Sequence, residues 1–295
     1  KEEDYIKHFF VTDTHSYLLL FTDKGNIHWL KAYQIPEAGR YAKGSNLVNI
    51  INLKDEKLAS IITINKFTEN NFLVMATEKG IVKKTLLMEY SRPRHGGIKG
   101  INLRENDKLI SVKLTNGEKQ LILATENGRA VRFMEKNVKS VARNSIGVRG
   151  INVRDSRVVG MEVVDAPYLL TVTEKGYGKR SLVEDYRLIN RGGSGVTNIK
   201  ITEKNSKVVG IKVVNDQDEI MLISKNGVII RMEVKKINVI GRNTQGVRLM
   251  NLGNDKLSSF VRIIKENEEE RDEYKPSEIT EDEMNKFIEK NEINN

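Results

Sequence analysis

Lysine and arginine recur at fixed positions along this chain of 295 residues. A first glycine recurs every 48 to 55 residues, at Gly25, Gly80, Gly128, Gly176 and Gly227. A second glycine follows each of them, at Gly44, Gly97, Gly147, Gly195 and Gly246, so positions can be counted from both. Regularly spaced cations on a surface bind phosphate groups, and their most common partner is nucleic acid. The basic positions lie four residues after the first glycine, four before the second and two after the second: Lys84, Arg132, Arg180 and Arg231; Arg40, Arg143, Arg191 and Arg242; Lys99, Arg149 and Arg248.

A few units lack a cation at one of these positions. Trp29 replaces the first, and Asn46 and Thr197 replace the third. A single lysine or arginine is usually just a solvated surface residue. Recurrence favours a functional stripe, because equal positions of stacked units fall on one face. We therefore predict a DNA-binding set that adds neighbouring cations: Arg40, Lys43, Lys83, Lys84, Arg92, Arg94, Lys99, Arg129, Arg132, Arg143, Arg149, Lys179, Arg180, Arg191, Arg231, Arg242 and Arg248.

Other kinds of site have less support in the sequence. Arg191–Gly195 and His95–Gly97 are glycine-rich, but neither has the Gly-Lys-Ser/Thr ending or the strand-to-helix context of a nucleotide-binding P-loop. The chain has no cysteine, and its four histidines do not cluster. No catalytic constellation stands out, and aromatic residues at 6% are too few for stacking on single-stranded bases. We expect no catalytic residue, no metal and no cofactor in this chain, with duplex DNA as its partner.

Short strands carry these cations. Phe72–Ala76 and Ile81–Leu87 are apolar runs separated by a turn that ends in Gly80, which predicts a hairpin with Gly80 at positive φ. The second half of a unit adds two more strands, such as Val148–Val153 and Val158–Val163. Four short strands per unit predict an all-β, propeller-like array of blades, each too small to fold alone. A β-solenoid is less favoured because its coils are shorter.

The repeat also sets the domain boundaries. We predict one domain over residues 1–264, with five complete four-stranded blades at about 12–67, 68–115, 116–164, 165–214 and 215–264. Residues 3–11 align with 106–114, so residues 1–11 are interpreted as the remnant of a sixth blade. Residues 265–295 are predicted to be an acidic tail, mostly disordered, with a short helix at 281–290.

The charge is distributed unevenly. Residues 266–295 hold 12 acidic and 4 basic side chains, a net of −8, so the overall +9 leaves +17 for the rest of the chain. A basic body fits a polyanionic partner, whereas the tail is either simply solvated or competes with DNA for the basic surface. No apolar run approaches the roughly 18 residues of a membrane helix, and no signal peptide opens the chain. We expect no membrane partner and a cytoplasmic, nucleoid-associated location.

Several stretches carry a family resemblance. The most specific is Val239–Val247, with the sequence Val-Ile-Gly-Arg-Asn-Thr-Gln-Gly-Val, and others are Ile6–Thr14, Lys31–Ala38, Asn144–Gly150 and Gly176–Arg180. With these, the chain resembles the C-terminal domain of the DNA gyrase A subunit, shared in looser form with topoisomerase IV. The similarity runs from residue 1 to about 264 and keeps the order of the units.

This resemblance implies a six-bladed β-pinwheel whose blades exchange strands with a neighbour and whose basic rim wraps duplex DNA. It also implies a larger enzyme, an ATP-dependent type IIA topoisomerase that introduces negative supercoils. In that A2B2 holoenzyme, a cleavage domain and a B subunit would supply the catalytic tyrosine and use ATP and magnesium. This chain alone would carry no catalytic residue.

One departure leaves alternatives open. The Gln-Arg-Arg-Gly-Gly-Lys-Gly box typical of gyrase is expected upstream of the region where this chain starts, and it is absent here; Arg94–Gly100 is only a partial look-alike. A topoisomerase IV domain, which wraps DNA more weakly, therefore stays possible. So does a propeller-type protein-binding module, which would need an apolar or peptide-binding face. A propeller enzyme would need polar groups converging near the axis, which the sequence does not show.

Overall fold

The structure, a computed structural model, describes residues 12–37, 50–51, 53, 55–94 and 96–264. In this part of the chain, short strands alternate with loops and five short 3₁₀ turns. The strands are β1 (Tyr17–Thr22), β2 (Asn26–Lys31), β3 (Leu58–Ile64), β4 (Phe72–Thr77), β5 (Ile81–Leu86), β6 (Ile98–Lys99), β7 (Leu109–Thr115), β8 (Gln120–Thr125), β9 (Arg129–Met134), β10 (Val148–Arg149), β11 (Val158–Val163), β12 (Tyr168–Thr173), β13 (Tyr177–Leu182), β14 (Val196–Thr197), β15 (Val208–Val214), β16 (Glu219–Ser224), β17 (Ile229–Glu233), β18 (Val247–Arg248) and β19 (Leu257–Ile263). The 3₁₀ turns are Ala32–Gln34, Leu87–Tyr90, Glu135–Asn137, Val183–Asp185 and Val234–Lys236.

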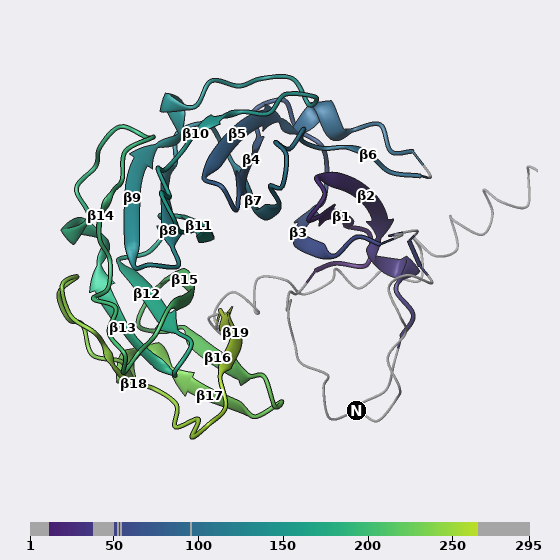
Figure 1. Cartoon of the computed structure of the whole chain (residues 1–295). Helices are drawn as coiled ribbons and strands as arrows, with labels where there is room; N and C mark the ends of the chain where they lie inside the picture. The colour runs from purple at the N-terminus through teal and green to yellow at the C-terminus, as the bar shows by residue number, and fades with distance from the viewer. Residues whose placement is uncertain (1–11, 38–49, 52, 54, 95, 265–295) are drawn as a thin grey trace, which may run out of the picture. The chain divides into compact units, whose positions relative to one another are not determined.

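The strands form five antiparallel sheets, which we call blades one to five in chain order (Figure 1). Each blade contains a hairpin and an inner strand from one unit, and blades one to four add an outer strand of two residues from the next unit. The strand orders are β3-β1-β2-β6, β7-β4-β5-β10, β11-β8-β9-β14, β15-β12-β13-β18 and β19-β16-β17. The predicted all-β, propeller-like blades are confirmed, and so is the strand exchange that the resemblance implied. Blade five has three strands among the described residues.

The prediction for the second half of a unit was wrong in its details. The strand expected at Val148–Val153 ends at Arg149, and it pairs with β5 of the preceding blade. Gly80 causes this early end. The N–H groups of Gly150 and Ile151 both donate to the Gly80 carbonyl, and Ile151 then enters the core. A Cβ on Gly80, whose φ is +82°, would lie 2.5 Å from the Ile151 carbonyl oxygen, so this approach requires glycine.

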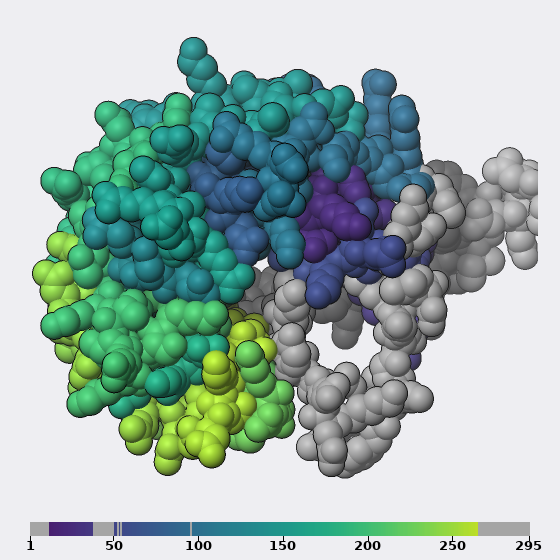
Figure 2. Space-filling model, viewed as in Figure 1, coloured from purple at the N-terminus to yellow at the C-terminus, as the bar shows by residue number. Residues whose placement is uncertain are grey.

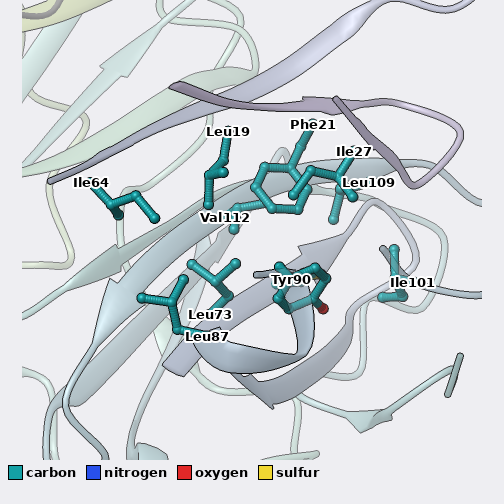
Figure 3. Close-up of a cluster of buried hydrophobic side chains, with 11 residues drawn as sticks. Leu19, Phe21, Ile27, Ile64, Leu73, Leu87, Tyr90, Ile101, Leu109 and Val112 are labelled. Carbon is teal, nitrogen blue, oxygen red and sulfur yellow. The ribbon is translucent and has the colours of Figure 1, made fainter. Parts of the chain in front are cut away.

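The hydrophobic cores lie between blades. Strand residues alternate between the two faces of a sheet, and in the hairpin strands both faces are buried, which explains the continuous apolar runs in the sequence. Figure 3 shows one core, in which Leu19 and Phe21 of blade one meet Leu73 and Tyr90 of blade two. Equivalent clusters join blades two to five. In the space-filling view, the colours follow the chain from purple to yellow, with the atoms of successive parts in contact (Figure 2). A smaller cluster of Leu18, Leu20, Leu30, Ile51 and Leu53 lies within the first unit, but the four larger cores each join two neighbouring blades.

The inner strands β3, β7, β11, β15 and β19 surround a common axis. Residues of all five line one cavity of about 220 Å³. On its wall the Glu162 carboxylate binds Lys113 at 2.6 Å and Lys212 at 2.9 Å, so one ionic cluster joins blades two, three and four. The three side chains are at most one-third exposed. Two predicted segments, the strand at 1–11 and the tail at 265–295 with its helix, lie outside the described residues.

Candidate nucleic-acid interface

The basic position four residues after the hairpin glycine is buried in blades two, three and four. Lys84, Arg132 and Arg180 are only 6 to 7% exposed. Each reaches across to the following blade and donates to backbone carbonyl groups in or beside its 3₁₀ turn. The bonds are Lys84 Nζ to Glu135 O (3.2 Å), Arg132 Nη1 to Val183 O (3.0 Å) and Tyr186 O (3.1 Å), and Arg180 Nε to Ile237 O (2.5 Å) and Nη2 to Lys235 O (3.2 Å). The exposed stripe expected at this position is therefore not what the structure shows.

The aromatic residue at the same position has the same role. Trp29 in blade one donates its indole N–H to the Tyr90 carbonyl at the end of the next blade's 3₁₀ turn, at 2.9 Å. A donor, rather than a charge, is what this position requires. Arg231 occupies the position in blade five, where it is exposed and pairs with Glu219. We call the donors Trp29, Lys84, Arg132 and Arg180 the inter-blade latches.

Two further predicted residues are fully buried. Lys83 and Lys179 have no exposed surface, and their ammonium groups donate to carbonyls of the basic loops above them. Burial, together with the nearby Arg143 guanidinium, lowers the pKa of Lys83 to about 7, against the opposing charge of Glu89. The pKa of Lys179 falls to about 8, also chiefly through burial. Neither side chain can touch DNA directly.

The two positions around the second glycine do come together at the outer edge of the blades. The arginine four residues before it donates from Nη1 to the backbone carbonyl of the residue two after it in the preceding unit. The pairs are Arg143 to Lys99 (2.9 Å), Arg191 to Arg149 (3.0 Å) and Arg242 to Thr197 (2.7 Å). The bond uses only the backbone carbonyl of the accepting residue; the Arg149 side chain is exposed, whereas the Lys99 ammonium group donates to the Lys24 carbonyl at 2.9 Å. We call Lys99, Arg143, Arg149, Arg191, Arg242 and Arg248 the rim band.

The exposure of the rim band is uneven. Lys99, Arg149 and Arg248 are exposed, whereas the arginines that make the carbonyl contacts are half-buried. Arg248 also lies over the Tyr177 ring, with 5.5 Å between its guanidinium carbon and the ring centroid, and donates to the phenol oxygen at 3.2 Å. Anchored guanidinium groups of this kind lose less side-chain entropy when they bind a phosphate. Two of the three predicted basic positions thus form one continuous band across blades one to five.

The remaining predicted residues lie in different surroundings. Arg92 and Arg94 are exposed in the loop before β6. Arg129 is half-buried and donates to the carbonyls of Ser194 and Gly195, both at 2.7 Å, beneath the loop of blade four. Arg40 and Lys43 lie outside the described residues.

The sequence reasoning missed a group of cations. Lys175, Lys204 and Lys256, with Arg248 of the rim band, line a surface hollow of about 500 Å³ between the hairpin turn of blade four and the turn before β19. Lys175 and Lys204 stand in turns next to Gly176 and Asn205, where side chains are usually exposed. Lys256 had a stronger signal, because it directly precedes an inner strand, as Lys57, Lys108, Arg157 and Lys207 do in the other units.

In the part of the chain that the structure describes, no group of three or more His, Cys, Asp or Glu side chains could hold a metal ion. The same residues include no helix long and apolar enough to cross a membrane.

Comparison with known proteins places these observations in context. The family model of the DNA gyrase C-terminal domain, described as a β-propeller, matches residues 16–65, 71–116, 119–165, 167–215 and 218–263. The DNA gyrase A subunit of Staphylococcus aureus (strain MRSA252) is 41% identical over 287 residues, which cover 95% of this chain and 32% of the relative. The chain therefore spans about one-third of the length of the curated relatives that it matches.

Two solved structures have similar folds. One is a DNA gyrase A C-terminal domain, with a TM-score of 0.76, 27% identity and coverage of 86% of this chain and 84% of the other. The second is the C-terminal domain of a DNA topoisomerase IV, with a TM-score of 0.78, 28% identity and coverage of 85% and 80%. The similarity thus reaches both branches of the topoisomerases that the sequence left open.

Proposed function

We propose that this chain, which belongs to the DNA gyrase C-terminal domain family, binds duplex DNA along the rim band and bends it around the blades. The observation that carries this proposal is the chain of arginine-to-carbonyl contacts that links the rim loops of successive blades. It turns separate basic loops into one cationic path. A path of this kind matches the regularly spaced phosphates of a duplex without reading base sequence.

Wrapping follows from how the path is built. Each rim loop belongs to a different blade, and the blades are turned relative to one another about the common axis, so DNA that contacts several loops must curve (Figure 1). DNA has a persistence length of about 150 bp, and bending a short site costs roughly 1–6 kcal/mol. Distributed contacts with lysine and arginine supply the compensating free energy.

We further propose a place for this domain in a holoenzyme. As part of a gyrase A subunit it would present wrapped DNA to a cleavage domain with a fixed crossing sign, so that ATP hydrolysis in a B subunit of an A2B2 complex yields negative supercoils. ATP and magnesium would act in those other parts, in the cytoplasm, on nucleoid DNA. The length and identity of the match to gyrase A subunits support this role.

Salt dependence of DNA binding tests the interface. With six rim-band cations on phosphates, log K for a duplex should fall against log salt with a slope of about −5, since each contact contributes about −0.9. Arg149→Ala or Arg248→Ala should reduce the slope by about one unit and weaken all sequences equally. A slope near zero would sink the proposal. Lys200→Ala, an exposed lysine outside the rim band, is the matched control.

A topology assay tests wrapping itself. The full chain is bound to nicked circular DNA, the nick is ligated, and the linking number is measured after the protein is removed. Wrapping predicts a shift of one sign that grows with the amount of protein bound, whereas tight binding without any shift would contradict it.

The main alternative is a topoisomerase IV domain, because the two structural matches are about equally similar to this chain. Such a domain would bind DNA with the same salt dependence but give a smaller linking-number shift. A protein-interaction module would show binding that is absent or insensitive to salt.

A further inference from the structure

The loops that carry the rim-band residues, here called the rim loops, pack on buried side chains of two kinds, polar and apolar. We call these buried side chains the floor of a loop. Three residues after the hairpin glycine, the side chain that lies beneath the next blade's loop is Lys83 in blade two and Lys179 in blade four, but Val131 in blade three. Each of the three is at most 1% exposed. Ten residues after the same glycine the difference recurs: Tyr90 and Tyr186 stand in blades two and four, and Val138 stands in blade three. The buried residue under the loop is therefore polar in blades two and four and apolar in blade three; in blade one it is His28, which is also polar and buried beneath Gly97.

The lysines bind the loops through backbone carbonyls. Lys179 Nζ donates to the carbonyls of Gly241 and Arg242, both at 2.7 Å. Lys83 Nζ donates to the carbonyl of Arg143 and, at 2.9 Å, to that of Gly100. Both lysines thus bind the backbone of the first rim-band arginine of the loop above.

The tyrosines complete each polar floor. The Tyr90 hydroxyl donates to the same Gly100 carbonyl at 2.9 Å. In blade four the Tyr186 hydroxyl donates to the Asn198 side-chain oxygen at 2.6 Å, and Asn198 occupies the position equivalent to Gly100. Both phenols are buried, so their hydrogen bonds hold in place the groups on which the lysine and its loop pack.

The loops above the polar floors share one sequence. Arg143–Arg149 and Arg242–Arg248 both read Arg-Asn-x-x-Gly-Val-Arg, with a rim-band arginine at each end. Arg191–Thr197, above the apolar floor of blade three, reads Arg-Gly-Gly-Ser-Gly-Val-Thr and lacks the second arginine. Arg129 holds this loop through the carbonyls of Ser194 and Gly195 instead.

We propose that Lys83 and Lys179 are positioning residues for DNA, which hold the two Arg-Asn-x-x-Gly-Val-Arg loops in the shape that aims both arginines outward. DNA is then gripped most firmly at two equivalent loops, two blades apart, with a weaker contact at the loop between them. The inference rests on the proposed function and adds to it that the loops above blades two, three and four do not hold DNA equally strongly.

The charges around the lysines give the proposal a distinctive signature. Arg143 and Glu89 face Lys83, and the Tyr90 phenol lies beside it. The pKa is lowered to about 7 for Lys83 and to about 8 for Lys179, so both ammonium groups lose their proton more easily than usual. DNA phosphates on the loop above favour the charged ammonium group and raise its pKa. Arg242 and Asp185 take the same places around Lys179, beside Tyr186. Binding therefore takes up protons near pH 8, and DNA affinity falls as the pH rises from 7 to 9.

Lys179→Met tests the proposal, because methionine keeps most of the side-chain volume but cannot donate. We expect DNA affinity to fall about tenfold, roughly the loss of one good phosphate contact, although every exposed cation remains. The dependence of affinity on pH should also weaken. Val131→Met, at the equivalent position on the apolar floor of blade three, is the control and should stay within about twofold of the wild type. Binding by Lys179→Met equal to the wild type, at temperatures below its melting transition, would overturn the inference.

Two measurements on the wild-type protein decide the question even if the methionine variant does not fold. Calorimetric titration with duplex DNA in buffers of different ionisation enthalpy should show net proton uptake at pH 8, and no uptake would contradict the proposal. Hydroxyl-radical footprinting should show two strongly protected segments flanking a weaker one, and equal protection of all three segments would contradict the proposal. Failure of the wild type to bind DNA at all would instead refute the proposed function.

Discussion

Arg132→Met tests whether the buried cations of the register hold blades together rather than bind DNA. Arg132 lies between blades three and four. Its Nη1 donates to the carbonyls of Val183 and Tyr186, its Nε to the Gln120 side-chain oxygen at 2.8 Å, and its Nη2 to the Glu184 carboxylate at 3.2 Å. Methionine fills much of the same space but donates no hydrogen bond. Two carbonyls beside the 3₁₀ turn of blade four then lose their donor.

The expected magnitude comes mainly from those carbonyls. A buried polar group left without a partner costs about 1–3 kcal/mol. The ion pair with Glu184 adds only about 0–1 kcal/mol, because the Glu184 side chain is 83% exposed and well solvated. We expect the free energy of unfolding to fall by about 3–4 kcal/mol and Tm by roughly 6–16 °C. The slope of log K for DNA against log salt should not change.

Urea unfolding and a salt titration of DNA binding, run on the same samples, measure the two effects separately. Arg149→Met is the matched comparison, because Arg149 is exposed on the rim band. It should keep the free energy of unfolding within about 0.5 kcal/mol and lose about one unit of salt slope. The reasoning would be refuted by the reverse pattern, in which Arg132→Met keeps its stability and loses salt slope.

Three further changes probe other parts of the structure. Gly147→Ala should destabilise the fold by about 2 kcal/mol or more, since φ is +101° and a Cβ would lie 2.5 Å from a backbone carbonyl oxygen, whereas Gly193→Ala, with open space around it, should be neutral in the same urea titration. Glu162→Gln should cost about 3–5 kcal/mol in unfolding experiments, because it leaves two partly buried lysines at the axis without their counter-charge. The free energy of unfolding should rise between about pH 7 and 9.5, because Lys83 and Lys179 bind protons less tightly in the folded state than in the unfolded chain, where their pKa is about 10.4. Lys83→Met should flatten that rise; above about pH 10 stability should fall instead, as tyrosines ionise in the unfolded chain more readily than in the core.

The blades were predictable because their signals are local. A hairpin needs two apolar runs and a glycine at positive φ between them, and all of these are contiguous in the sequence, as at Gly80, where φ is +82°. The outer strands were not predictable from pattern. β10 is only two residues long and pairs with residues of β5 far earlier in the chain, so its extent depends on where Gly150 meets Gly80. Only the family resemblance indicated that strands are exchanged.

The regular spacing of the cations correctly predicted that residues at the same offset occupy equivalent places in successive blades. It wrongly predicted that the residues four positions after the hairpin glycine are exposed. Equal offsets do fall on equal places, but Lys84, Arg132 and Arg180 lie between blades. Periodicity carries no information on whether a strand faces solvent or a neighbouring blade when both faces of the strand are buried. The useful signal was Trp29, since an indole can replace a guanidinium as a donor to a carbonyl group but cannot replace it as a phosphate-binding cation.

The buried latches and the exposed rim band depend on each other mechanically. DNA bent around the rim pushes back with an elastic free energy of roughly 1–6 kcal/mol, and that load falls on the interfaces between blades. Each interface joins an apolar core to a latch such as Arg180, which grips two carbonyls of the next blade. Separating the blades would expose the apolar core to water and exchange these hydrogen bonds for bonds to water, so the interface resists the bending load. The curvature of bound DNA is therefore set by how the blades pack, and the buried cations contribute to wrapping without touching DNA.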